Sequence, residues 1–439
     1  MLLEFETENY KSFKDRVKFS MIPAPKQKGL DYSILTETIN NKIFKSLSTS
    51  VIYGANAAGK TNIIGALDVF RAIVMRGNIF NATGVFDGNV SHYMLELIPN
   101  NSLVVQKDVS FSIKFIQNEL LFSYSLSIDL GTFCIQNYKR RITAENLTVN
   151  DRIVFNRSGN KIEFGTLKDL ETYLLPNYTK NKNVLKFTAE QGLVAEELFL
   201  TNGFKTTISQ QLSAKVYKYF SDSLKPICNS QYFSSQFNSR QKDKANTLMN
   251  LAVSRLGINS NSLAFVKQQN DTFDKLVSVF EDKHLLIPAE FIESFGTLRF
   301  VDLFPVLAGI FSHGGVLLID EFDTSLHPMV VMNIINIFHD DTINKNHAQL
   351  IFNTQNPIFL NNNLFRRDEI KFVERSDENN FSELYSLSDF GTKGTNARKG
   401  KDYMNNYFMS KYGAIRDIDL SDVFEKIVET SNDSETPNQ

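Results

Sequence analysis

The sequence predicts an α/β protein that combines mixed and antiparallel sheets with a helical insertion. Short apolar strands alternate with amphipathic helices in the last third of the chain, which is typical of a parallel sheet covered on both faces. Between residues 91 and 164 the apolar residues instead recur at every second position, which is typical of an antiparallel sheet. We therefore expect four parts, which are 1–164, a mainly helical insertion at 165–285, a second α/β part at 286–425, and a flexible tail at 426–439.

The first part is expected to contain a hairpin, a strand, a helix and then the antiparallel sheet. Residues 1–20 contain two short segments in which apolar and polar residues alternate. The turn-like NYKSFKD joins them, so the pattern predicts a β-hairpin. STSVIYG (48–54) indicates a short buried strand, and residues 61–77 place apolar side chains at helical spacing up to Gly77. The expected strands of the antiparallel sheet are YMLELI, VSFSIKFI, LLFSYSLSI, FCIQNYKRRI, DRIVFN and KIEF.

The later part alternates between helix and strand patterns. FVDLFPVLAGIF and MVVMNIINIF have the apolar content of buried helices. Each is followed by a short apolar strand, VLLID (316–320) and AQLIFN (348–353) respectively. IKFVE (370–374) and SELYSL (382–387) indicate a terminal strand pair. The polar tail is expected to fray.

Composition excludes several classes of protein. The 439 residues carry 47 basic and 49 acidic side chains, so the net charge of −2 gives no general attraction to nucleic acid or to anionic membranes. Cys134 and Cys228 lie far apart, which makes a structural disulfide or zinc site unexpected. The N-terminus lacks the pattern of a signal peptide, and no apolar run reaches the roughly 20 residues that span a bilayer. We expect a cytoplasmic protein without membrane association.

A phosphate-binding loop follows the first buried strand. Gly54-Ala-Asn-Ala-Ala-Gly59-Lys60-Thr61 matches G-x-x-x-x-G-K-[ST] and lies between a strand and a helix, as this motif requires. Its backbone N–H groups and the helix N-terminus would bind phosphate oxygens of ATP, Lys60 would face the β- and γ-phosphates, and Thr61 would bind Mg²⁺. We include the neighbouring Asn56 and Asn62 among the nucleotide-binding residues. The alternative is a strand–turn–helix corner with chance glycines.

Carboxylates follow the apolar strand 316–319. Burying acidic side chains at the end of a strand costs free energy unless a cation lies nearby. With the phosphate loop present, Asp320 is predicted to orient Mg²⁺, and Glu321 to polarise the water that attacks the γ-phosphate. The alternative is that one of these residues, or the nearby Asp323, only caps the following helix.

These two motifs together resemble the ABC class of ATPases, and especially its soluble branch with SMC-like and OLD proteins. The opening LLEFETENYKSFKD is similar to the first strand and turn of that branch, and DTSLHP (323–328) to its D-loop. ESFGTLRF (293–300) resembles the signature loop, which implies that Ser294 and Gly296 bind the γ-phosphate of a nucleotide held by another subunit. The alternative for SFGT is an ordinary helix N-cap.

The resemblance also implies the biological setting. The segment from residue 364 to 390, together with KYGAI (411–415), resembles the free-standing ATPase subunits of abortive-infection and PARIS-type anti-phage systems. Such a subunit would form a homodimer or larger homo-oligomer with a separate effector, expected to be a Toprim-type nuclease, and would respond to a phage protein or DNA. OLD proteins carry their own Toprim domain, and too few residues follow Gly413 for one here.

Two further features separate this sequence from related ATPases. The family has a histidine after the strand that follows the acidic strand, and Gln355 stands at that place. Glutamine keeps an N–H donor but cannot become positively charged, so we expect tight ATP binding with slow hydrolysis; alternatively Gln355 only caps the Asn356-Pro357 turn. More than half of the chain separates Lys60 from Ser294, which argues against an ABC transporter subunit.

The sequence thus predicts an ATP hydrolase that acts as sensor or scaffold of a defence system. One alternative is a DNA-bound repair or chromosome-maintenance ATPase. Another is an interaction module that binds nucleotide with little hydrolysis. Three short basic clusters could contact DNA. Each lacks interleaved aromatic residues, however, and is typical of a solvated surface. They are Lys139-Arg140-Arg141, Arg366-Arg367 and Arg398-Lys399 with Lys401.

Overall fold

The computed structural model describes most of the chain. The described residues are 1–25, 27, 29–80, 95–101, 105–133, 138–176, 178–227, 239–255, 262–266, 275–390, 402–416 and 418–433. Both cysteines and the basic cluster at 398–401 lie outside these ranges.

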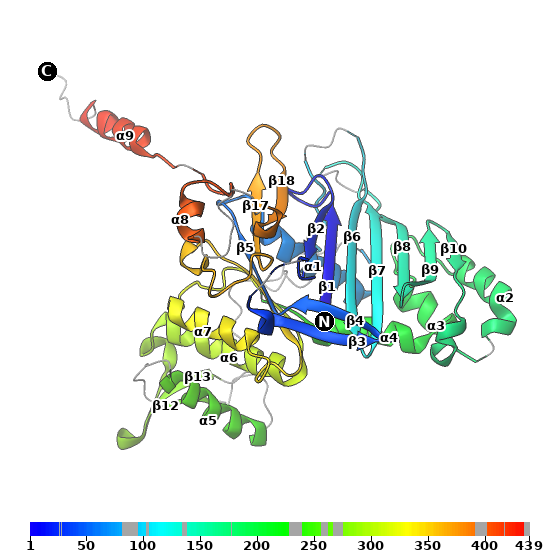
Figure 1. Cartoon of the computed structure of the whole chain (residues 1–439), viewed down its shortest axis with the longest axis horizontal. Coiled ribbons are helices and arrows are strands. Elements are labelled where there is room, and N and C mark those ends of the chain that lie inside the picture. Colours follow the sequence, from blue (N-terminus) through cyan, green and yellow to red (C-terminus); the bar gives the residue numbers. More distant parts are fainter. Residues whose placement is uncertain are drawn as a thin grey trace.

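A six-stranded sheet forms the centre of the fold (Figure 1). Five strands run parallel, and the edge strand β18 pairs antiparallel with its neighbour. In spatial order the strands are β11 (Leu224–Ile227), β15 (Gly315–Ile319), β16 (Ala348–Asn353), β5 (Thr49–Tyr53), β17 (Ile370–Arg375) and β18 (Ser382–Ser386). Because β5 lies between β16 and β17, segments from both ends of the sequence build one sheet.

Helices cover both faces of this sheet. Along β15, Val316 and Leu318 belong to the core that contains α1 (Lys60–Arg76), whereas Leu317 and Ile319 belong to the core that contains α6 (Phe295–His313) and α7 (Pro328–His339). This division follows from the alternation of side chains along a strand. Strands buried on both faces explain the continuous apolar runs in the sequence.

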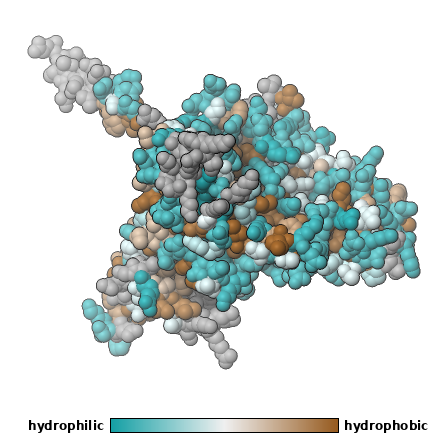
Figure 2. Space-filling model, in the orientation of Figure 1, coloured by the Kyte–Doolittle hydropathy of each residue, from teal (hydrophilic) through white to brown (hydrophobic). Residues whose placement is uncertain are grey.

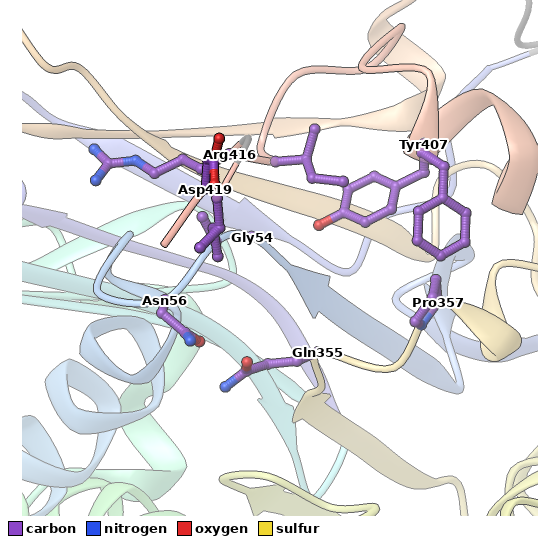
Figure 3. Close-up of a pocket in the computed structure, with 11 residues that line it drawn as sticks. Gly54, Asn56, Gln355, Pro357, Tyr407, Arg416 and Asp419 are labelled. Atoms are coloured by element: carbon purple, nitrogen blue, oxygen red, sulfur yellow. The ribbon is translucent and has the colours of Figure 1, made fainter. Parts of the chain in front are cut away.

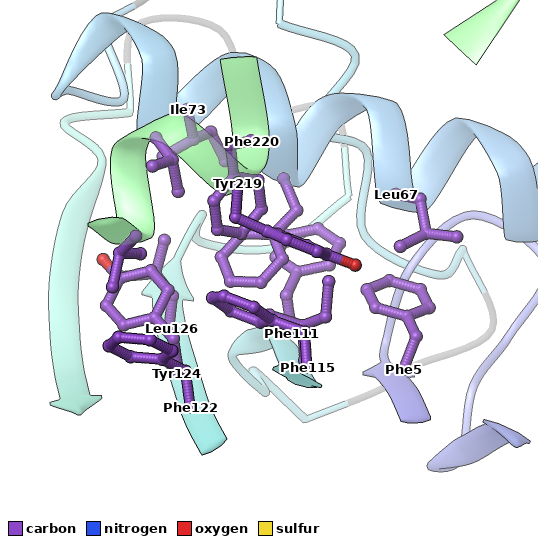
Figure 4. Close-up of a cluster of buried hydrophobic side chains, with 14 of the residues drawn as sticks. Phe5, Leu67, Ile73, Phe111, Phe115, Phe122, Tyr124, Leu126, Tyr219 and Phe220 are labelled. Carbon is purple, nitrogen blue, oxygen red and sulfur yellow. The ribbon is translucent and has the colours of Figure 1, made fainter. Parts of the chain in front are cut away.

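A seven-stranded antiparallel sheet packs on the other side of α1. Its order is β10 (Lys161–Phe164), β9 (Arg152–Ser158), β8 (Arg141–Val149), β7 (Leu120–Asp129), β6 (Val109–Gln117), β1 (Leu2–Glu8) and β2 (Val17–Ser20). Aromatic side chains join α1 to this sheet, since Phe70 stacks on Phe111 and Tyr124 with centroid distances of 5.4 and 5.6 Å. Figure 4 shows Phe111 and Tyr124 within the buried cluster beside α1. The hairpin β3 (Ile34–Ile39) and β4 (Lys42–Leu47) packs on the outer side of β1 through the cluster that includes Leu3, Leu35 and Ile39.

The predicted fold class, α/β with mixed and antiparallel sheets plus helices, is confirmed, and two predicted strands differ. The described part of YMLELI, residues 95–98, is not a strand, although Leu95 and Leu97 are buried. The alternation there reflects one-sided burial of a loop segment, which bonds to the N-terminal turn through Lys11 N–H and Ile98 O. Within FCIQNYKRRI, the strand begins only at Arg141.

The segment at 165–285 contains strands as well as helices. Its helices are α2 (Tyr178–Gln191), α3 (Lys205–Thr207), α4 (Gln210–Lys218) and α5 (Ser239–Arg255). It also contributes β11 to the central sheet, and β12 (Ser262–Val266) and β13 (Lys275–Phe280) pair with β14 (Leu285–Pro288) in a three-stranded sheet. The strands β11, β12 and β13 are only four to six residues long and include polar residues such as Lys225 and Ser278, so the sequence pattern alone does not distinguish them from short helices.

The C-terminal region ends in two helices, α8 (Tyr403–Phe408) and α9 (Ser421–Asp433). α9 includes the first residues of the tail 426–439, and the flexibility of that tail stays a prediction. Val423, Phe424 and Ile427 recur at helical spacing, and all three are exposed where α9 extends from the body (Figure 1).

One helix among the described residues, α6, is long and apolar enough to cross a membrane by length and composition. Its buried residues Val301, Leu307 and Ile310 belong to the core on one face of the central sheet. We therefore interpret α6 as a packed helix of the core rather than as a membrane span.

Candidate functional site

The phosphate loop lies where β5 ends and α1 begins, as the sequence predicts. Gly59 precedes α1 with φ of +108°, and Ala57 is also left-handed, so the loop curls before the helix starts. No side chain caps the N-terminus of α1. The first N–H groups of a helix lack intrahelical acceptors and carry the positive end of the helix dipole, so this end of α1 suits an anion.

Neighbouring segments fix the shape of the loop. A Cβ on Gly54 would lie 2.3 Å from the carbonyl oxygen of Val373, so only glycine allows the loop to pass this close to β17. Ser382 Oγ donates to the carbonyl of Ala58 at 2.5 Å. Asn62 Nδ2 donates to Ser12 Oγ at 2.7 Å, so this predicted nucleotide contact is also a tie to the N-terminal turn. The sequence pattern does not reveal Ser12 and Ser382, because their importance depends on tertiary contacts.

Lys60 is the cation of the loop. Its side chain is buried, and Nζ donates to the carbonyl oxygens of Gly54 and Ala55 at 2.8 and 2.9 Å. Burial lowers the pKa of Lys60 below its usual value, and the charges of Glu321 and Asp320 partly oppose that effect. These two carboxylates therefore lie near enough to share one electrostatic environment with the loop.

Asp320 follows β15 and contacts the first turn of α1. Thr61 Oγ1 donates to Asp320 Oδ1 at 3.0 Å, which brings together two predicted site residues from distant parts of the sequence. Asn353, at the end of the adjacent strand β16, donates from Nδ2 to the same oxygen. Asp320 and Asn353 are both nearly inaccessible to solvent. Sequence reasoning missed Asn353, although its place at the carboxyl end of a neighbouring parallel strand was a usable signal.

Glu321 has a different backbone geometry from Asp320. Its φ is +50°, a left-handed conformation that costs a non-glycine residue about 1 kcal/mol or more. The side-chain oxygen of Asn353 accepts a hydrogen bond from the Glu321 N–H at 2.6 Å and holds this turn. Glu321 is partly exposed, so the turn presents one carboxylate to solvent while Asp320 stays buried. Strained residues of this kind concentrate at functional sites.

The oxygen donors at this edge fit a magnesium ion bound together with a nucleotide. Mg²⁺ prefers oxygen ligands, keeps several waters and commonly takes only one or two protein ligands beside phosphate oxygens. Thr61 Oγ1 and Asp320 Oδ1 provide such a pair. Among the described residues, no group of three or more histidine, cysteine, aspartate or glutamate side chains could hold a metal by itself. The geometry suits a nucleotide-borne metal better than a resident one.

Ser294 and Gly296 lie at the start of α6, and Gly296 lies against the predicted D-loop. Ser294 is the N-cap, and its Oγ accepts from the Thr297 N–H at 3.1 Å, so the alternative of a helix cap is realised in the structure. A Cβ on Gly296 would lie 2.7 Å from the carbonyl oxygen of Ser325, which explains the glycine as a close-approach residue. Ser294 thus bonds within its own helix, and Gly296 lies against the D-loop of the same chain.

Gln355 lines a cavity beside the phosphate loop. The cavity has a volume of about 570 Å³ and is also lined by Gly54, Asn56, Tyr407 and Arg416. Figure 3 shows the side chains of Asn56 and Gln355 pointing toward each other from opposite walls. The turn at Pro357 is capped by Asn356, since its side chain accepts from the Ile358 N–H at 3.1 Å. The capping role considered for Gln355 therefore belongs to its neighbour.

The N-terminus of α7 and the arginine pair at 366–367 both have definite partners. His327 caps α7 by accepting from the Met329 N–H at 3.2 Å, so Asp323 does not cap that helix. Arg366 and Arg367 are buried, and they bond to Asp368 and to the carbonyl oxygen of Phe390 respectively. This pair is structural and not a solvated basic surface.

The basic cluster at 139–141 is partly neutralised by ion pairs. Arg141 pairs with Asp129 at 2.8 Å, and Lys139 lies 3.4 Å from Glu196. Arg140 is half-buried, and burial lowers its pKa, with the neighbouring Arg76 adding to that effect. We find no continuous basic face in these residues.

Comparison with known proteins gives one family match. The family model described as "AAA domain, putative AbiEii toxin, Type IV TA system" matches residues 50–361, which include the loop and both carboxylates. No curated protein matches the chain in sequence.

Solved structures with similar folds include SMC heads. "SmcHead bound to the C-winged helix domain of ScpA" is 12% identical with a TM-score of 0.40, covering 89% of this chain and 98% of that chain. The SMC head domain from Thermotoga maritima is 13% identical with a TM-score of 0.39, covering 88% and 98%.

Replacing Asn353 by alanine should destabilise the site. The substitution leaves Asp320 and the left-handed turn at Glu321 without their shared partner, so we expect the free energy of unfolding to fall by about 1–3 kcal/mol. Denaturant titration measures this change. The control is Asn363→Ala at an exposed position, which should change stability by less than about 0.5 kcal/mol. Equal stability of the two variants would contradict the role assigned to Asn353.

Proposed function

Because the chain belongs to the AAA-domain family that its residues 50–361 match, we propose that it is an ABC-class ATPase that hydrolyses ATP slowly between two copies. One observation supports this proposal more strongly than the others. The hydrogen bond of 3.0 Å between Thr61 and Asp320 joins the phosphate loop to the acidic strand, as a Mg²⁺–ATP site requires. A chance glycine corner offers no reason for a buried carboxylate at this position.

The residues of the chain would act on ATP as follows. The uncapped N-terminus of α1 and the curled loop bind the phosphates, and Lys60 exchanges its contacts with the Gly54 and Ala55 carbonyls for phosphate oxygens. Thr61 and Asp320 would hold Mg²⁺, which neutralises charge on the β- and γ-phosphates. Glu321, turned out of the strand by its left-handed backbone, accepts a proton from the attacking water.

A second copy would complete the site. At the N-terminus of α6, Ser294 bonds to the Thr297 N–H and Gly296 lies against Ser325 of the D-loop of the same chain. We propose that they face the γ-phosphate bound by a partner, so that two nucleotides lie between two subunits. Phe295, next to them, is 80% exposed, and Phe291 is 75% exposed. Large apolar side chains at this degree of exposure support an interface at the signature loop.

The biological role that we propose is that of a sensor or scaffold in anti-phage defence with a separate effector, expected to be a Toprim-type nuclease. The family description names a toxin of a type IV toxin–antitoxin system, which supports a defence setting. The alternative of a DNA-bound repair ATPase gains no support from Arg366 and Arg367, because both are buried and bonded within the fold. Binding of duplex DNA that weakens steeply with salt would favour that alternative instead.

Glu321→Gln should retain ATP and stop its turnover. The amide keeps the size of the side chain but cannot accept the proton of water, so we expect a loss of about 10²- to 10⁴-fold in single-turnover rate with binding intact. Rapid-mixing assays with Mg²⁺–ATP measure this rate. Lys60→Ala is the matched comparison and should lose binding itself. Full hydrolysis by the Glu321→Gln variant would exclude Glu321 as the base.

The signature residue should act across the subunit interface. Lys60→Ala and Ser294→Arg chains should each be inactive alone, whereas a mixture should recover activity because one mixed dimer contains one complete site. Steady-state hydrolysis at varied mixing ratios tests this expectation, and native mass spectrometry confirms that the subunits exchange. Mixed dimers without activity at any ratio would argue against a site shared between two copies.

Gln355 should limit the rate of hydrolysis. Gln355→His would add a side chain that can carry a positive charge near the γ-phosphate, so we expect the single-turnover rate to rise about tenfold, equivalent to about 1.4 kcal/mol of barrier. Gln355→Ala should lower the rate. Asn361→Ala, at an exposed position on the following turn, serves as a control for local effects. Identical rates for glutamine, histidine and alanine at position 355 would place this residue outside the reaction.

A further inference from the structure

A second large cavity lies along the edge strand β11 of the central sheet. It has a volume of about 820 Å³ and is lined by residues of α1, the β6–β7 turn, the segment 218–227 and the C-terminal part of α6. Gly314, which immediately precedes β15, is one of its lining residues, whereas Asp320 follows the other end of that strand. The cavity also reaches Ile227 at the other end of β11, whose carbonyl oxygen accepts from the Asp320 N–H at 3.3 Å. It nevertheless shares no lining residue with the cavity beside the phosphate loop, so the two are distinct cavities.

The lining of this cavity, which we call the basic cavity, carries an excess of positive charge. Arg71, Lys218 and Lys225 contribute three cations and Asp222 contributes one carboxylate. His313 also lines the cavity, and one of its ring nitrogens, Nδ1, lies 3.0 Å from the carbonyl oxygen of Gly309. The net charge of the lining is therefore at least +2, although the whole chain is slightly acidic.

Two of these cations are held in place by the backbone. Arg71 Nε donates to the carbonyl oxygen of Phe220 at 2.9 Å, and Lys225 Nζ donates to that of Ser221 at 2.8 Å. Burial lowers the pKa of Lys225, the charge of Arg71 lowers it further, and Asp222 opposes both effects. Two cations positioned near each other in a partly buried wall favour binding of an anion between them.

A glycine keeps the cavity open. Gly309 lies inside α6, where glycine costs about 1 kcal/mol relative to alanine. Nothing lies within 4 Å of the position that its Cβ would occupy, so packing does not require glycine here. Gly309 lines the basic cavity, and a larger side chain at this position would fill part of it. A small residue at position 309 therefore leaves room in the cavity that a long side chain would occupy.

We infer that the basic cavity binds a small phosphorylated molecule of about the size of a mononucleotide. Its volume lies within the range of about 300–1,000 Å³ that is usual for small-molecule sites. The three cations suit phosphate oxygens, while the amides of Gln117 and Asn118 can bond to polar groups of a sugar or base. Val306 and Ile310 provide an apolar wall for the rest of the ligand. A single concave site of this kind fits a small molecule better than a nucleic-acid strand, which needs an extended basic track.

The binding test uses the full chain with Lys60→Ala, so that the phosphate loop does not compete. Adenosine monophosphate, inorganic tripolyphosphate and a single-stranded oligonucleotide are titrated separately by calorimetry. We expect adenosine monophosphate to bind, and the added substitutions Lys218→Ala and Lys225→Ala to weaken its affinity about tenfold or more. Gly309→Leu should weaken the affinity to a similar extent without changing any charge.

Two matched controls test whether the loss of affinity is specific to the basic cavity. Gly309→Ala and Lys205→Ala, the latter at an exposed lysine in α3, should leave the affinity for adenosine monophosphate within about twofold. Tripolyphosphate could bind more tightly than adenosine monophosphate and respond in the same way to the substitutions. That result would still support a phosphate site, and it would identify inorganic polyphosphate as the ligand. The inference is overturned if neither small molecule binds, if Lys205→Ala weakens binding as much as the lysine pair, or if only the oligonucleotide binds.

Discussion

The contact between Thr61 and Asp320 is the interaction on which the rest of the site depends. Thr61 lies in the first turn of α1 and Asp320 lies at the end of β15, so their hydrogen bond of 3.0 Å fixes the phosphate loop against the central sheet. A carboxylate that is 7% exposed requires such partners, because burying an unpaired charge is very unfavourable. Asn353 is the second hydrogen-bond partner of Asp320. Its side-chain oxygen also accepts from the Glu321 N–H and so fixes the turn that directs the two carboxylates differently.

The order of the strands explains how residues from distant parts of the sequence meet at one edge. β5 and its loop insert between β16 and β17, and the parallel arrangement brings the carboxyl ends of β5, β15 and β16 together. Ligands of open α/β sheets bind outside these carboxyl ends. The antiparallel sheet then packs on α1 through Phe70, Phe111 and Tyr124 and holds the helix whose N-terminus forms the loop.

The sequence predicted the parts of the site that depend on local pattern. Lys60 and Thr61 were identifiable because a strand, a glycine-rich turn and a helix must follow in fixed order around them. Asp320 was identifiable because it directly follows a short apolar strand. No motif marks Asn353 or Ser382, and only Asn353 has a usable signal in the sequence, which is its place at the end of a predicted parallel strand. Their roles come from strand order and from contacts between segments that are remote in sequence, which periodicity does not encode. The same limit applies to β12 and β13, which are only five and six residues long and carry too little pattern to distinguish them from helix.

Calorimetric titration of ATP, with Mg²⁺ and with a chelator, tests most directly whether Asp320 and Thr61 form the magnesium end of a nucleotide site. The titrations compare the wild type with Asp320→Asn, which keeps the shape of the side chain but removes the charge that binds a hard cation. Mg²⁺ should therefore strengthen ATP binding in the wild type and have little effect in the variant. Asp323→Asn, three positions along the chain, should behave as the wild type. If Mg²⁺ strengthened ATP binding equally in Asp320→Asn and in the wild type, Asp320 would have no part in holding the metal.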